Sequence, residues 1–95
     1  MTKVVSTKLF TINLQEILDY IEKDNSKTIA DKIESSIMNA IELLQYFPNY
    51  GQPAVNKKGE EAFHVLIVGN YRVIYEYSND VVYVHDIFDS RRNYA

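Results

Sequence analysis

The last quarter of the 95-residue chain contains two stretches rich in valine, isoleucine and tyrosine, separated by Ser78, Asn79 and Asp80. β-Branched and aromatic side chains fit the pleated surface of a strand, and Asn and Asp tolerate the positive φ that tight hairpin turns require. The pattern therefore predicts a β-hairpin formed by residues 71–77 and 81–88. This hairpin restricts the possible folds, because other elements must cover one of its apolar faces.

Two amphipathic helices are predicted before the hairpin. Apolar side chains recur at helical spacing, first at Phe10, Leu14, Ile17, Leu18 and Ile21 and then at Ile29, Ile33, Ile37, Ile41 and Leu44. Ser6 or Thr7 can cap the first helix, and residues 24–26 interrupt the pattern and can cap the second. Pro48 ends the second helical stretch. A short connection between two such helices favours an antiparallel pair.

The remaining strand signals lie at the start of the chain and before the hairpin. Val4 and Val5 indicate a short strand within residues 2–6, whereas residues 49–53 have the composition of a loop. Residues 62–68 alternate as a strand, with one face carrying His64, Leu66 and Val68 and the other carrying Phe63, Val65 and Ile67. Gly69 and Asn70 then form a turn.

These elements predict one α+β domain that includes residues 1–95. An N-terminal strand precedes an antiparallel two-helix hairpin, which packs on an antiparallel β-sheet that ends in a three-strand meander. Both faces of the meander carry apolar or aromatic residues, and the helices can cover only one of them. The uncovered face predicts a surface for a partner.

The composition, 46% hydrophobic and 24% charged, is typical of a soluble globular protein. The absence of cysteine excludes a disulfide framework and a thiolate metal site and fits a reducing cytoplasm. No apolar stretch approaches the roughly 20 residues that span a bilayer, so we expect a cytoplasmic location and no membrane partner. The net charge of −3 argues against a free-standing nucleic-acid binder, although the arginines can still form a local positive patch.

Arg72 lies inside the first strand of the hairpin, and Arg91 and Arg92 follow the second. Because the strands are antiparallel, the start of one lies beside the end of the other, which predicts that Arg72 and Arg91 form a joint anion-binding site. Two plainer interpretations remain open. Arg72 can pair with Glu76 or Asp86, and Arg91 and Arg92 can belong to a solvated tail.

His64 and His85 are candidate general acids, because imidazole titrates near neutrality. The plainer interpretation is that each is a half-buried polar residue of a strand. A metal site at His85 and Asp86 is disfavoured, because adjacent strand residues point to opposite faces. We predict no metal and no cofactor. The tyrosines near the C-terminus can stack on nucleic-acid bases or pack at strand edges with wet hydroxyls.

Several segments together resemble the RelE/ParE superfamily, toxins of bacterial type II toxin–antitoxin systems, and the ParE-like branch in particular. They are residues 14–21, residues 41–44 leading into 47–53, residues 68–75, and the terminal Arg91, Arg92 and Asn93. The resemblance implies a cytoplasmic toxin neutralised by a cognate antitoxin, which wraps an extended segment over the helices and sheet. It also implies one of two actions, poisoning of DNA gyrase or cleavage of mRNA in the ribosome.

For an mRNA endoribonuclease, the resemblance assigns catalytic roles to Arg72 and Arg91, with His64, His85 or Tyr94 for proton transfer. The lysines that RelE-like members carry on the preceding strand are replaced here by Phe63, His64 and Val65, which weakens that assignment. Tyr71, Tyr75 and Arg92 are the candidates for binding the antitoxin or the target.

We therefore expect a ParE-like toxin that binds a protein target such as DNA gyrase. The first alternative is a ribosome-dependent, metal-independent mRNA endoribonuclease. The second is an inactive remnant that keeps only its antitoxin-binding surface.

Overall fold

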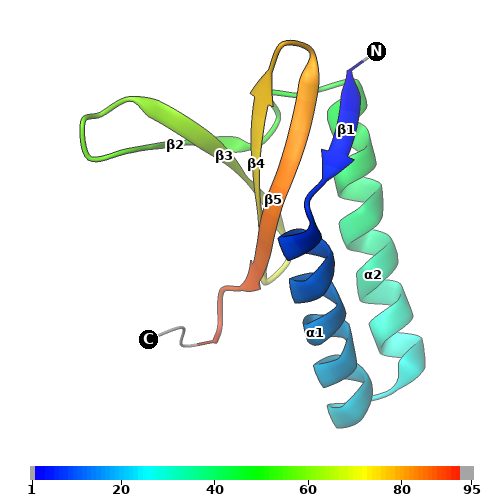
Figure 1. Ribbon diagram of the computed structural model, residues 1–95. Coiled ribbons are helices and arrows are strands. Elements are labelled where there is room, and N and C mark those ends of the chain that lie inside the picture. Colours follow the sequence, from blue (N-terminus) through cyan, green and yellow to red (C-terminus); the bar gives the residue numbers. More distant parts are fainter. Residues whose placement is uncertain (1, 93–95) are drawn as a thin grey trace.

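The computed structural model describes residues 2–92, except for the side chain of Glu61. In chain order the elements are β1 (Lys3–Ser6), α1 (Lys8–Asp24), α2 (Lys27–Glu42), the 3-10 helix η1 (Leu43–Gln45), β2 (Gln52–Val55), β3 (Glu61–Val68), β4 (Tyr71–Ser78) and β5 (Val81–Asp89). The strands form one sheet in the order β1-β5-β4-β3-β2. Both helices lie on one side of this sheet (Figure 1), which confirms the predicted α+β class.

The turns and helix starts follow the local sequence signals. Asn79 and Asp80 have φ values of 52° and 62°, so the β4–β5 turn is the tight hairpin turn that was predicted. The hydroxyl of Thr7 accepts a hydrogen bond from a backbone N–H in the first turn of α1, and that of Ser26 does the same for α2. Each cap satisfies a donor that has no partner within its helix.

The sheet differs from the expected one at both edges. β1 pairs with β5 in parallel, so the sheet is mixed rather than antiparallel. Two parallel strands need a long connection between them, and α1 and α2 are part of that connection. The sequence of β1 alone does not indicate which strand it pairs with. At the other edge, Gln52–Val55 form a strand where a loop was expected. Pro53 signals a loop, yet an edge strand tolerates it because one side has no ladder to donate to.

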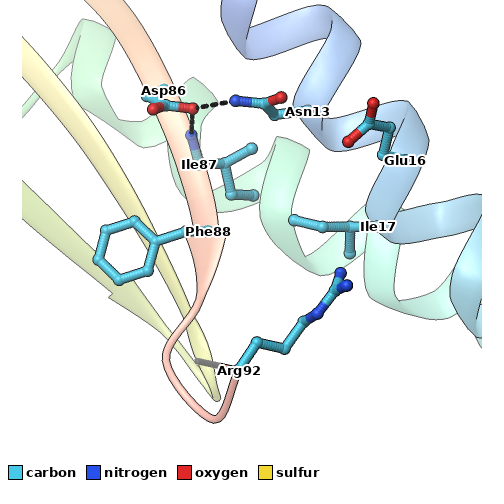
Figure 2. A pocket seen from close by; sticks show the side chains of 7 residues that line it. All are labelled: Asn13, Glu16, Ile17, Asp86, Ile87, Phe88 and Arg92. Carbon is cyan, nitrogen blue, oxygen red and sulfur yellow. Dashed lines mark hydrogen bonds between the residues drawn. The ribbon is translucent and has the colours of Figure 1, made fainter. Parts of the chain in front are cut away.

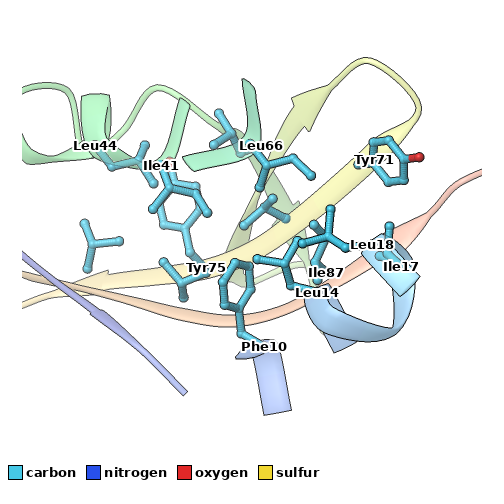
Figure 3. Packing of buried hydrophobic residues seen from close by; sticks show 14 of the residues in the cluster. Phe10, Leu14, Ile17, Leu18, Ile41, Leu44, Leu66, Tyr71, Tyr75 and Ile87 are labelled. Carbon is cyan, nitrogen blue, oxygen red and sulfur yellow. The ribbon is translucent and has the colours of Figure 1, made fainter. Parts of the chain in front are cut away.

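The core lies between the helices and the sheet (Figure 3). Its apolar members come from every layer: Phe10, Leu14, Ile17, Leu18, Ile21, Ala30, Ile37, Ile41, Leu44, Leu66, Tyr71, Val73, Tyr75, Val82, Val84 and Ile87. The predicted stripe of α1 is confirmed in full. The prediction of the buried stripe of α2 was wrong at its first position, because Ile29 is exposed and Ala30 is buried there. The first turn of α2 extends beyond the part of the sheet that could cover Ile29.

The face of the sheet away from the helices is not covered by any other element within residues 2–92. This agrees with the prediction that the helices can cover only one of the two apolar faces of the meander. Ile67 and Tyr83 are exposed on this face, and Phe63, Val65 and Phe88 are half-buried. The ribbon formed by β2 and β3 also extends away from the helices (Figure 1). Within residues 2–92, no helix is both long and apolar enough to cross a bilayer.

Candidate functional site

Arg72 is used locally, at the turn between β3 and β4. Its Nη1 atom donates to the carbonyl oxygen of Gly69 at 3.0 Å and to that of Tyr71 at 3.2 Å. The alternative in which Arg72 pairs with Glu76 or Asp86 is absent from the described ion pairs, where Glu76 instead lies beside His85. The guanidinium of Arg72 therefore stabilises the turn between β3 and β4.

Arg91 folds back onto the last residue of β5. Its guanidinium forms a fork with the buried carboxylate of Asp89, with Nε to Oδ1 at 3.1 Å and Nη2 to Oδ2 at 2.9 Å. Its backbone N–H also donates to Oδ1 at 2.9 Å. The Arg91 hydrogen bonds lower the pKa of Asp89, and the same carboxylate raises the pKa of Arg91. The guanidinium lies 5.9 Å from the centre of the Tyr71 ring.

The two arginines do not form the predicted joint site. Tyr71 pairs with Asp89 and Arg72 pairs with Phe88, so the ends of the strands do lie side by side. However, Tyr71 faces the helices and Arg72, the next residue, points to the opposite face of the sheet. Arg91 lines a pocket with residues of α2, on the helix side. The prediction failed because it used strand register alone. Register determines which backbone positions lie side by side, whereas the alternation of side chains along a strand determines the face of the sheet to which each side chain points.

The candidates for proton transfer are also separated. His64 is buried on the helix side, where it stacks on Tyr75 with ring centres 5.1 Å apart. His85 lies beside Tyr83, and its Nε2 is 3.2 Å from Glu76 Oε2, an ion-pair distance without hydrogen-bond geometry. Tyr94 lies outside the described residues. Within residues 2–92, the histidines and arginines assigned to RNA cleavage thus occupy different environments.

Tyr71 and Tyr75 belong to the core, contrary to the prediction that they contact a partner. Tyr75 is 0% exposed, and Tyr71 is buried except where it borders small pockets beside Arg91. The hydroxyl of Tyr75 donates to the carbonyl oxygen of Pro48 at 2.8 Å and accepts from the N–H of Gly51 at 2.8 Å. Their strand positions were predicted correctly, but they face the helices.

A groove between α1 and β5 was not predicted (Figure 2). Its volume is about 540 Å³, and it is lined by Asn13, Glu16, Ile17, Asp86, Ile87, Phe88 and Arg92. β1 pairs with β5 only as far as Val84, so the rest of this strand edge borders the groove. Asp86 Oδ1 accepts from Asn13 at 2.6 Å and from the Ile87 N–H at 2.7 Å, which covers part of that edge.

The pairing of β4 with β5 shifts register after Ile74, which marks a β-bulge beside the groove. Val84 and Ile87 are both buried although three positions separate them. Asp86 pairs with Ile74 at this bulge, and its carboxylate accepts a hydrogen bond from Asn13 of α1. The only sequence signal was that Asn13 and Glu16 lie off the buried stripe of α1.

Arg92 is the candidate residue that the structure places in this groove. Its side chain is exposed and reaches toward Ile17 of α1 (Figure 2). The guanidinium lies 5.1 Å from the centre of the Tyr20 ring. Acidic Glu16 and Asp86, basic Arg92 and an apolar lining together fit a polypeptide segment that carries both apolar and charged side chains.

The Asp89–Arg91 fork predicts an acid-sensitive contribution to stability. A carboxyl group whose pKa is lower in the folded state stabilises the fold above its unfolded pKa, near 4, and loses this effect as the pH falls below that value. Asp89→Asn should therefore lower the melting temperature at pH 7, and the difference from wild type should shrink by pH 3. Thermal melts at pH 7, 5 and 3 test this.

Asp31→Asn is the matched control, because Asp31 forms an exposed pair with Lys27 that contributes little at any pH. A difference between Asp89→Asn and wild type that is the same at pH 3 as at pH 7 would contradict the role given to the fork.

Comparison with known proteins adds to this geometry. The fold is a small α+β domain in which two helices cover one face of a five-stranded sheet. A family model described as "ParE toxin of type II toxin-antitoxin system, parDE" matches residues 4–94, and the chain belongs to this family. No curated protein matched the chain.

A solved structure described as "Chromosomal ParDE TA system from P. aeruginosa" has a similar fold. The TM-score is 0.78 at 15% sequence identity, and the match covers 94% of this chain and 96% of that chain. At this identity the likeness concerns the fold alone.

Proposed function

We propose that this chain is a ParE-like toxin that stops growth by binding a protein target such as DNA gyrase and is neutralised by a cognate antitoxin. Membership of the family supports the toxin assignment. The observation that carries the mode of action is the separation of Arg72 and Arg91 onto opposite faces of the sheet. Within residues 2–92, the arginines and histidines that RNA cleavage would use are not gathered at one place, which supports action by binding.

The endoribonuclease alternative has less support from the geometry. Cleavage by a 2′-hydroxyl requires positive charge at the phosphate and a group that moves a proton. Arg72 donates to backbone carbonyl groups and Arg91 to the carboxylate of Asp89, so part of each guanidinium is already engaged, and Asp89 offsets the positive charge of Arg91. His64 is buried against Tyr75, away from either guanidinium.

The antitoxin is expected to occupy the α1–β5 groove. An extended or helical segment with apolar side chains can cover Ile17 and Ile87, while its charged side chains meet Glu16, Asp86 or Arg92. Such a segment pays an ordering cost when it binds, which a long contact surface offsets.

Expression of the chain without its antitoxin tests the proposal. Growth should stop, DNA replication should stall and mRNA should stay intact. Co-expression of the small protein encoded beside it should restore growth. Arg72→Ala and Arg91→Ala are matched variants, because they should still arrest growth if the toxin acts by binding, but should lose mRNA cleavage if it is a nuclease. A culture that grows normally would favour the inactive remnant.

A further inference from the structure

The charged side chains that line the α1–β5 groove are arranged by sign along α1. At one end, Asp86 Oδ1 accepts a hydrogen bond from Asn13 at 2.6 Å, and Glu16 follows one helical turn further along α1. At the other end, the guanidinium of Arg92 lies 5.1 Å from the centre of the Tyr20 ring. Asn13 and Tyr20 are two helical turns apart, which is about 10 Å along the helix axis. The groove therefore has an acidic end and a basic end.

A second hollow continues the groove at its basic end. Its volume is about 340 Å³, and Ile17 and Arg92 line both hollows, so the two adjoin. Asp89 and Arg91 also line the second hollow, but their charges offset each other because they form an ion pair at 2.9 Å. The unbalanced charge of the second hollow is thus the positive charge of Arg92.

The charges at both ends are available to a partner. Glu16 and Arg92 are exposed, and in the part of the chain that the structure describes neither forms an ion pair or a side-chain hydrogen bond. Asp86 is held in place by the hydrogen bonds that it accepts from Asn13 and from the Ile87 N–H. A side chain that is already fixed loses little freedom when a partner's cation binds to it.

The distance between the two ends limits the spacing of the partner's charges. Between the ends lie the apolar side chains of Ile17, Ile87 and Phe88 (Figure 2). A length of about 10 Å corresponds to about three residues of an extended segment or about seven residues of a helix. A complementary segment therefore carries a basic and an acidic side chain at such a spacing, with apolar side chains between them.

We propose that the antitoxin segment in this groove is ordered by charge. Its lysine or arginine lies beside Glu16 and Asp86, its apolar side chains cover Ile17, and its aspartate or glutamate lies beside Arg92. The inference rests on the proposed function and adds the order of charges to the occupant of the groove. A segment of equal net charge but different order would meet like charges at one end, and this repulsion would exclude it.

Charge reversals at the two ends test the order. Glu16→Lys and Arg92→Glu are made singly and together in the full chain, and binding of the purified small protein encoded beside the toxin is measured by calorimetry. Each single reversal should weaken binding at least about tenfold. The double variant keeps the net charge of wild type, because one change adds the positive charge that the other removes. It should nevertheless bind at least about 100-fold more weakly, since the two effects add in free energy.

Glu22→Lys combined with Lys23→Glu is the matched control. It makes the same pair of charge changes on α1, at two residues that line neither hollow. This control should bind the antitoxin as tightly as wild type does. All four changed residues are exposed, so the melting temperatures of the variants should differ little from that of wild type.

The outcomes separate this inference from the function on which it rests. A double variant that binds as wild type does would show that net charge alone matters, and single variants that bind normally would place the antitoxin elsewhere; either result overturns the inference. Lost growth arrest or lost self-association with unchanged antitoxin binding would assign the groove to the target or to a second copy, and also overturns it. If wild type binds the antitoxin but does not arrest growth, the proposed function fails while the comparison of affinities still decides the inference.

Discussion

Truncation of Tyr75 to alanine is expected to lower the free energy of unfolding by about 3–5 kcal/mol, as for other large buried aromatic side chains. The ring is 0% exposed and stacks on His64, so its removal leaves a cavity in the core. Domains of this size are stable by about 5–15 kcal/mol, so the loss is a large fraction of the total stability. Urea denaturation followed by circular dichroism measures the change.

Tyr75→Phe separates the ring from its hydroxyl. Burial raises the pKa of Tyr75, so the hydroxyl stays protonated at neutral pH and can donate to Pro48. Its removal leaves the Gly51 N–H and a carbonyl without this partner, at a cost of about 1–3 kcal/mol. If Tyr75→Phe were as stable as wild type, the hydroxyl would not hold the segment between η1 and β2 in place.

The second large effect is expected from Ile37→Ala, compared with Ile29→Ala in the same helix. Ile37 is 0% exposed and Ile29 is 42% exposed, although both fit the apolar periodicity of α2. Truncation of Ile37 should cost about 2–5 kcal/mol. Truncation of Ile29 should cost well under half as much, because its site has no cavity to leave and alanine favours the helix. Equal losses in urea denaturation would contradict the position of α2 on the sheet.

Local chemistry made much of the fold predictable. Asn79 and Asp80 specified the hairpin turn, Thr7 and Ser26 were candidate caps, and the stripe of α1 faces the core throughout. Features that depend on distant segments were not predictable. The parallel pairing of β1 with β5 is one of these. β2 is another, because Pro53 is compatible with a strand only when that strand lies at an edge.

The candidate site was harder to predict because it depends on the direction of single side chains. Antiparallel pairing correctly predicted that Arg72 lies near the end of β5. It did not predict that the Arg72 side chain points to the face of the sheet opposite the one on which Arg91 lies. The bulge after Ile74 also shifted the alternation of β5, so that Ile87 rather than Asp86 is buried together with Val84. A pattern with a strict period of two contains no information about such a shift.

The most direct test of the account is an assay of DNA supercoiling by purified gyrase with the purified toxin added, alongside an assay of mRNA cleavage on translating ribosomes. The account predicts that supercoiling is inhibited in proportion to toxin concentration and that mRNA remains intact. Unaffected gyrase together with mRNA cut in the ribosome, and loss of this cutting in Arg72→Ala or Arg91→Ala, would contradict it.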